Sequence, residues 1–100
     1  MKLSIDTSDS ENIKVTLGSI KIERNSREKK SQLLLQSIKE ALDKEKIKLK
    51  DLTEIEVKTG PGSFTGLRVG VSVANALRWS LKIPVNGKNI DADGQVEPVY

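Results

Sequence analysis

The 100-residue sequence contains no cysteine, no histidine and only three aromatic residues. Without cysteine, a disulfide framework and thiolate zinc sites are excluded. Without histidine as well, Cys and His nucleophiles and imidazole general bases are excluded. We therefore assign this chain no catalytic residue and no metal site, and any chemistry must use carboxylates, hydroxyls, amines or a partner.

Long hydrophobic runs are also absent. No stretch approaches the ~18 consecutive apolar residues of a membrane helix, and the N-terminal segment meets a carboxylate at Asp6, which does not fit a signal peptide. We expect a cytoplasmic chain with no membrane partner. With 36% apolar residues, the length fits one small domain whose core is built mainly from Ile, Leu and Val.

The net charge is +3, and the basic excess lies in the first half, which carries 12 basic and 8 acidic residues. Basic runs at 27–30 and 44–50 can attract RNA or an acidic partner. The same runs are interleaved with acidic residues and lack aromatic neighbours for base stacking, which is typical of a solvated helix face.

Alternating polar and apolar residues predict four strands, at about 2–6, 13–17, 20–23 and 54–58, and a fifth near 83–85. Gly18 and Ser19 predict a hairpin turn. Apolar residues at spacings of three and four predict a helix that Ser26 or Ser31 caps and that ends near 46. A second helix, 67–81, is apolar on more than one face and needs neighbours on two sides. The pattern predicts an α/β fold with a mixed five-stranded sheet, a β-hairpin start and two main helices.

The segment 60–66, Gly-Pro-Gly-Ser-Phe-Thr-Gly, joins the fourth strand to the second helix. Ser63 and Thr65 can cap that helix, and its outward-pointing amides make an anion site plausible. The spacing matches neither a P-loop nor a dinucleotide fingerprint. The other interpretation is purely structural, a sharp turn into a tightly packed helix. We expect Gly62 or Gly66 to adopt backbone angles closed to other residues.

Polar residues also end the first strand. Asp6-Thr7-Ser8 can coordinate Mg²⁺ through water or bind a phosphate, but such residues are common in ordinary turns. The candidate nucleotide- or anion-binding residues are Asp6, Thr7, Gly62, Ser63 and Thr65. Arg68 can pair with a carboxylate or phosphate, and its position near a helix N-terminus hints at a role. We expect Trp79 to pack in the core or at an interface.

Residues 59–74, Thr-Gly-Pro-Gly-Ser-Phe-Thr-Gly-Leu-Arg-Val-Gly-Val-Ser-Val-Ala, resemble the signature of the TsaB (YeaZ) family. The opening Ile5-Asp6-Thr7-Ser8 is similar to the family's first strand. The hairpin, the long helix and the turn at 49–52 match the family's layout, so the resemblance covers about residues 1–85. It implies a single actin-like ATPase lobe with a ribonuclease H-like fold.

The resemblance implies a non-catalytic scaffold subunit rather than an enzyme. Such a subunit binds TsaD, and TsaE in bacteria, in the complex that makes threonylcarbamoyladenosine next to the anticodon of tRNA. It implies indirect contact with tRNA, a homodimer when the chain is alone, and no cofactor on this chain, with ATP or ADP and magnesium only at the level of the complex. The two helices, near 31–46 and 67–81, would form the pairing surface. The candidate interface residues are Leu34, Ile38, Ala41, Gly70, Val73, Ala74 and Leu77.

The expected domains are a TsaB-like N-terminal lobe, 1–85, and a short C-terminal extension, 86–100, in place of the second lobe of longer members. Glu97-Pro98-Val99-Tyr100 is similar to the Pro-x-Tyr segment with which longer members close, which favours a natural minimal form; a shortened chain is the alternative. The competing function is a nucleotide- or phosphate-binding domain of the actin-like ATPase class that uses Asp6, Thr7 and the glycine loop.

Overall fold

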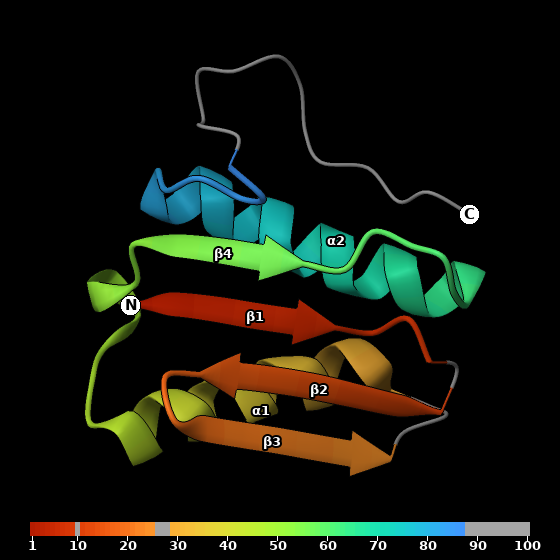
Figure 1. Ribbon diagram of the computed structural model, residues 1–100, viewed down its shortest axis with the longest axis horizontal. Helices are drawn as coiled ribbons and strands as arrows, with labels where there is room; N and C mark the ends of the chain where they lie inside the picture. Colours follow the sequence, from red (N-terminus) through yellow and green to blue (C-terminus); the bar gives the residue numbers. More distant parts are fainter. Residues whose placement is uncertain (10, 26–28, 88–100) are drawn as a thin grey trace.

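The structure is a computed structural model that describes residues 1–9, 11–25 and 29–87. These residues form two layers, a four-stranded sheet and a pair of helices that cover one of its faces (Figure 1). In chain order the elements are β1 (Lys2–Asp6), β2 (Asn12–Leu17), β3 (Ile20–Asn25), α1 (Lys30–Glu45), the 3-10 turn η1 (Leu49–Asp51), β4 (Glu54–Val57) and α2 (Phe64–Leu81).

The sheet has the strand order β3-β2-β1-β4. β1 is antiparallel to β2 and parallel to β4, and β2 and β3 form the predicted hairpin, with Gly18 at φ 59° in its turn. α1 packs on β2 and β3, while α2 packs on β1 and β4. The carboxyl ends of β1 and β4 therefore lie side by side, next to the start of α2.

The fifth strand of the prediction is wrong, because Val85 forms only an isolated bridge with Ile55. The Ile55 amide donates to the Pro84 carbonyl (2.9 Å), and the Asn86 amide donates to the Ile55 carbonyl (2.8 Å). Asn86 then has φ 51°, and its side-chain amide bonds both the N–H and the C=O of Val57 (2.8 and 2.9 Å). A side chain thus takes the ladder bonds that the next strand residue would make, and the strand stops.

The helix starts also differ from the prediction. The residue before α1 is Lys29, in the left-handed conformation (φ 54°) and without a side-chain cap, so Ser31 lies inside the first turn; Ser26 lies outside the described residues. α2 begins three residues earlier than expected. Ser63 caps it as predicted, because its hydroxyl oxygen accepts a bond from the Gly66 amide (3.3 Å).

The core lies between the two layers. It is formed by the inward residues of all four strands together with one stripe of each helix, principally Leu3, Ile5, Ile13, Val15, Leu17, Ile55, Val57, Leu34, Ile38, Val71 and Ala74. Alternation in the strands and the spacing of three and four in the helices place these residues inward. Trp79 is 77% exposed, so the prediction that it packs in the core is wrong and only its interface role remains.

Candidate functional site

A track of glycines brings the end of β1 against α2. Gly66 and Gly70 are four residues apart and lie on one line of α2, and Gly62 precedes the helix cap in the loop. A Cβ atom at Gly62 would lie 2.6 Å from the Ser8 carbonyl oxygen. A Cβ atom at Gly66 would overlap the Thr7 carbonyl oxygen, and one at Gly70 would overlap the Thr7 hydroxyl. The glycines are therefore required because Thr7 and Ser8 lie in contact with this segment, through their backbone at Gly62 and Gly66 and through the Thr7 side chain at Gly70.

The expectation that Gly62 or Gly66 adopts backbone angles closed to other residues is wrong. Neither Gly62 nor Gly66 has a positive φ, and in the loop between β4 and α2 that conformation occurs at Gly60, with φ 150°. Close approach of a second segment, which local sequence does not reveal, is what excludes a side chain at 62 and 66. The structural interpretation of the motif is supported.

Thr7 is part of this contact rather than of an open anion site. It is 0% exposed, and its hydroxyl donates to the Gly66 carbonyl oxygen (2.6 Å). Next to it, the Ser63 amide donates to the Ser8 carbonyl oxygen (2.7 Å). A buried hydroxyl with a strong internal partner holds β1 to α2 and is not accessible to a ligand. The prediction that Thr7 binds an anion is therefore not supported by its position.

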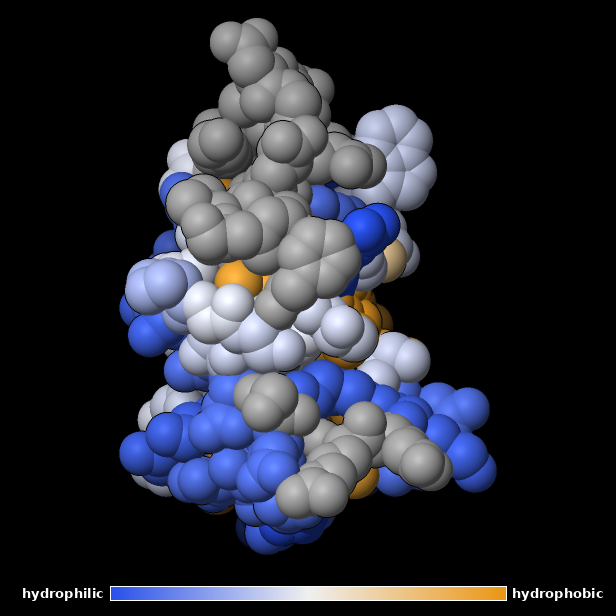
Figure 2. Space-filling model, turned by 90° about the vertical axis from the view of Figure 1, so that its right-hand side faces the viewer, coloured by the Kyte–Doolittle hydropathy of each residue, from blue (hydrophilic) through white to orange (hydrophobic). Residues whose placement is uncertain are grey.

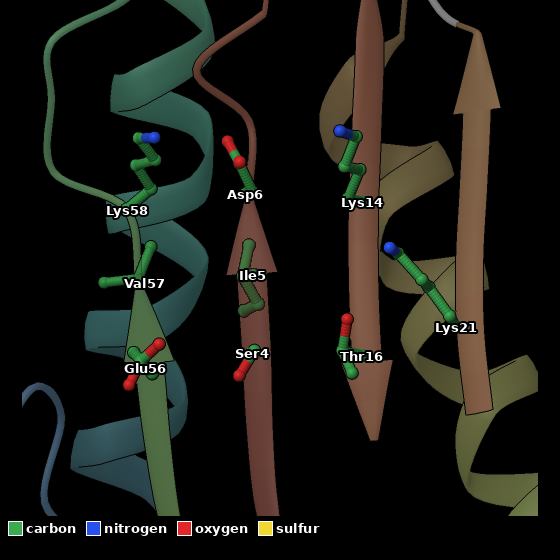
Figure 3. Close-up of a pocket in the computed structure, with 9 residues that line it drawn as sticks. All are labelled: Ser4, Ile5, Asp6, Lys14, Thr16, Lys21, Glu56, Val57 and Lys58. Atoms are coloured by element: carbon green, nitrogen blue, oxygen red, sulfur yellow. The ribbon is translucent and has the colours of Figure 1, made fainter. Parts of the chain in front are cut away.

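Asp6 lies on the opposite face of the sheet, in a shallow cavity of about 350 Å³. Figure 3 shows Asp6 between Lys58 and Lys14, with the polar residues of the next cross-strand row, Glu56, Ser4 and Thr16, below them. Thr65 lines a different pocket, on the helix side. The structure thus separates the five candidate anion-binding residues: Asp6 faces the open side of the sheet, Thr7 is in the core and Thr65 is on the outer side of α2.

The open sheet face carries charges of alternating sign. Cross-strand register aligns Asp6 with Lys14 and Lys14 with Glu23, and Lys58 follows β4 beside Asp6 (Figure 3). In the next rows Glu56 lies beside Ser4 and is paired with Lys2 at 3.3 Å. Opposite charges on neighbouring strands stabilise a sheet in water. The face is therefore well suited to solvent and has no strong excess of positive charge for a phosphate.

The pKa of Asp6 is lowered from its ordinary value of 3.8. Partial burial opposes ionisation, but hydrogen bonds from the Ser8 hydroxyl (2.6 Å) and amide (2.9 Å) and the charges of Lys58 and Lys14 outweigh it. A general base that works near neutral pH needs a raised carboxyl pKa. Asp6 is tuned in the opposite direction, toward a permanently ionised structural role.

We expect Asp6→Asn to lower the free energy of unfolding at pH 7, by less than about 1 kcal/mol because solvent screens the site. Since the folded pKa lies below 3.8, the carboxylate stabilises the fold above that pH, and the contribution is lost as the pH falls through the folded pKa. Urea unfolding of both proteins should show the difference at pH 7 and a progressively smaller one as the pH is lowered below 3.8. A difference that does not change with pH would contradict this account.

The outer face of α2 is the second candidate surface. A pocket of about 360 Å³ lies there, lined by Ser31 of α1 and by Thr65, Arg68, Val69, Ser72 and Val73 of α2. Figure 2 shows apolar side chains exposed in a hollow on its right-hand side, where the helices lie, while the sheet side is mostly hydrophilic. Further along the two helices, Leu35 is 53% and Trp79 is 77% exposed. Exposed apolar surface of this kind marks interaction sites.

This surface differs in its residues from the predicted interface. Leu34, Ile38, Ala41, Gly70 and Ala74 are buried inside the chain, and only Val73 and Leu77 of the predicted set are partly exposed. The predicted helices offer an outer face, but other residues form it. Leu35, Ser72 and Ala76 are on the exposed side of the helices and are not among the predicted residues, because the prediction followed the apolar stripe that faces the core. Marking the core stripe on a helical wheel and taking the opposite side would have found them.

The described part of the chain has neither a metal cluster nor a membrane helix. Within residues 1–9, 11–25 and 29–87, three or more carboxylate, His or Cys side chains do not come together as a metal site. Neither helix of these residues is long and apolar enough to cross a membrane.

Comparison with known proteins finds similarity to proteins of tRNA threonylcarbamoyladenosine biosynthesis. A family model described as "TsaD: tRNA N6-adenosine threonylcarbamoyltransferase" matches residues 17–89. The tRNA threonylcarbamoyladenosine biosynthesis protein TsaB of Bacillus subtilis is 41% identical, over 50% of this chain and 26% of the relative. TsaB of Buchnera aphidicola from Schizaphis graminum is 46% identical, over 54% of this chain and 26% of the relative.

A solved structure, YeaZ from Pseudomonas aeruginosa, superposes with a TM-score of 0.71 and 26% identity, over 84% of this chain and 41% of that one. The chain thus spans about a quarter of the length of these curated relatives and 41% of the solved structure. Because the family model covers most of the residues and these relatives and the solved structure are TsaB or YeaZ proteins, the chain belongs to the TsaD family and, within it, to the TsaB (YeaZ) proteins.

Proposed function

We propose that this chain is a non-catalytic scaffold subunit that binds TsaD, and TsaE in bacteria, in the complex that makes threonylcarbamoyladenosine next to the anticodon of tRNA. The names of the TsaB relatives support this pathway, and similarity to a tRNA N6-adenosine threonylcarbamoyltransferase of Clostridioides difficile, at 46% identity, supports a pairing of related folds. Contact with tRNA is then made through the complex. The subunit works in the cytoplasm, where the tRNA is.

The outer face of α2 is the observation that carries the proposal. It combines Val69 and Val73 with the small residues Ser72 and Ala76, and it ends at the exposed Trp79. Small residues let a partner helix approach closely, and an exposed tryptophan is a typical anchor of an interface. When TsaD is absent, the same face pairs two copies of the chain.

A scaffold role also fits the titratable groups of the open sheet face. The pKa of Asp6 is lowered, and the lysines around it are balanced by carboxylates on neighbouring strands. Residues 1–85 act as the partner-binding lobe. The chain needs no cofactor of its own; ATP or ADP and magnesium act at the level of the complex.

The alternative is a nucleotide- or phosphate-binding domain. The observation in its favour is the cavity that contains Asp6, which Lys58 lines on one side of Asp6 and Lys14 and Lys21 line on the other (Figure 3). The balanced charge of this face and the buried position of Thr7 weigh against it. Titration of ATP and magnesium into the isolated chain separates the two functions. For a scaffold subunit we expect no heat of binding in this titration. Micromolar binding of ATP that is lost in the Lys14→Glu variant would favour the alternative.

The proposed function is tested by reconstitution. The chain is combined with its cognate TsaD and TsaE, ATP, threonylcarbamoyl-adenylate and tRNA, and modified adenosine is measured by mass spectrometry. We expect product only when the chain is present, and Asp6→Ala, Ser63→Ala and Thr65→Ala should lower the yield only as far as they weaken assembly. If one of these changes reduced turnover by ~10³-fold or more while folding and assembly stayed intact, the scaffold role would be wrong.

A further inference from the structure

The two edges of the sheet end in different ways. At the β4 edge, residues 84–86 bond the main chain of Ile55, and the Asn86 side chain bonds that of Val57. At the other edge β3 is the outermost strand, and it forms the lower border of the sheet in Figure 1. α1 lies behind β2 and β3 in this view, against their faces. Within the described residues, the β4 edge is therefore covered and the β3 edge is open to a further strand.

The main chain of β3 has bonding groups that point out of this edge. The hairpin closes at Leu17 and Ile20, across a two-residue turn, and such a closing pair is hydrogen-bonded. Bonded and non-bonded pairs alternate from there, so the N–H and C=O groups of Lys21 and Glu23 point away from β2. The register of the hairpin is continuous, and β3 contains no proline. The bulges and prolines that commonly protect an edge are therefore absent from this strand.

Opposite charges stand at these two positions. Lys21 and Glu23 are exposed and lie on the open face of the sheet. A second, antiparallel β3 with the twofold axis at Ile22 places Lys21 opposite Glu23 twice. A shift of the axis to Lys21 or to Glu23 places that residue opposite its own copy, and like charges in this position destabilise a sheet. The charges of β3 thus select one register of self-pairing.

We propose that β3 pairs with β3 of a second copy of this chain, antiparallel and with the axis at Ile22, so that the two four-stranded sheets become continuous. The alternation of charge on the open face then continues across the junction, because the row of Asp6, Lys14 and Glu23 meets Lys21 of the second copy. In the single chain Lys21 leans over β2 (Figure 3), and its flexible stem lets it turn to a carboxylate on either side. The inference does not rest on the proposed function, and this pairing leaves the outer face of α2 free.

The test measures self-association by sedimentation in the Ala76→Arg variant, whose long charged side chain blocks the α2 face. We expect this parent variant still to form a dimer at high micromolar concentration. Adding Lys21→Glu or Glu23→Lys should weaken the dimer by at least about tenfold, because each change sets like charges opposite one another at two symmetric positions. Lys50→Glu is the matched control, since Lys50 is exposed in η1, which leads to β4 at the far edge. It should leave the dimer unchanged.

Mixing the two charge variants tests the register itself. One variant carries two negative charges at positions 21 and 23 and the other carries two positive charges, so an equimolar mixture should form a heterodimer with about the affinity of the parent. Circular dichroism checks that each variant is folded. Lys21→Glu is the milder change, because Lys21 lies opposite the neutral Thr16 in its own hairpin.

Amide hydrogen exchange tests the main-chain bonds. In the parent variant, the amides of Lys21 and Glu23 should exchange fast at low concentration and gain protection as the dimer forms. The amide of Ile22 bonds to β2 in this alternation, so it should be protected at both concentrations and serves as the internal control.

Three results would overturn this pairing. The first is a parent variant that stays monomeric at high micromolar concentration. The second is a single charge variant that dimerises as well as the parent, or a mixture that does not recover the dimer, since the contact then lies elsewhere. The third is protection of the β3 amides only when TsaD is added, which would make TsaD the occupant of the edge. The first two results leave the proposed binding of TsaD at α2 intact.

Discussion

Gly70→Ala is expected to lower the free energy of unfolding by about 2 kcal/mol, although the same change in an open helix interior would raise it by roughly 1 kcal/mol. The added methyl group would overlap the buried Thr7 hydroxyl, which is held by its bond to Gly66 (2.6 Å). Chemical denaturation followed by circular dichroism measures the change. The sign of the change in unfolding free energy is decisive. An increase in stability would show that Gly70 of α2 does not contact Thr7 at the end of β1.

A double-mutant cycle identifies the atom responsible. Thr7→Ala removes the hydroxyl that the new methyl group would meet, so Thr7→Ala combined with Gly70→Ala should cost clearly less than the two separate changes together. Gly66→Ala is the contrasting case, because its methyl group would overlap the Thr7 backbone carbonyl. That atom is not removed by any substitution at 7, so Thr7→Ala should not rescue Gly66→Ala. Simple additivity at position 70 would contradict the contact.

Ala76→Arg should weaken TsaD binding by at least about a hundredfold while the domain stays folded. Ala76 is exposed on the outer face of α2, and arginine is a good helix former, so the fold tolerates the change. A long charged side chain would hold a partner helix away from Val69, Val73 and Trp79. The affinity can be measured by calorimetry, and the yield of modified adenosine should fall with it.

The control for this variant is Gln36→Arg. Gln36 is exposed on α1 and belongs to neither of the lined pockets. The Gln36→Arg substitution adds the same charge to a helix surface. It should leave TsaD binding and the yield of modified adenosine at the wild-type level. Equal losses in both variants would point to net charge rather than to the α2 face.

Much of the fold is predictable from local pattern. The alternation in 13–17 and 20–23 and the turn at Gly18 predict the hairpin that the structure contains, because one strand face is buried and the other is wet. The signature at 59–74 predicts the TsaB (YeaZ) family, which is confirmed. Ser63 as a helix cap is also confirmed, since capping depends on residues only three apart.

The remainder depends on contacts between distant parts of the chain. The role of Gly66 and Gly70 follows from where Thr7 lies, more than fifty residues earlier. The fifth strand fails because the Asn86 side chain takes the bonds of Val57. Five of the predicted interface residues are buried inside the chain, because apolar character does not distinguish the core side of a helix from its outer side. Leu34 and Leu35 are adjacent and alike, yet one is 0% and the other 53% exposed.

The central claim is that the outer face of α2 contacts TsaD, and the single tryptophan of the chain reports on it directly. Trp79 is 77% exposed, so 5-fluorotryptophan incorporated into this chain gives one fluorine resonance from that face. When unlabelled TsaD is added, we predict that the resonance shifts and loses its sensitivity to solvent isotope, because a partner excludes water from the ring. If sedimentation shows the complex and the resonance stays unchanged and solvent-sensitive, TsaD binds elsewhere and the account is wrong.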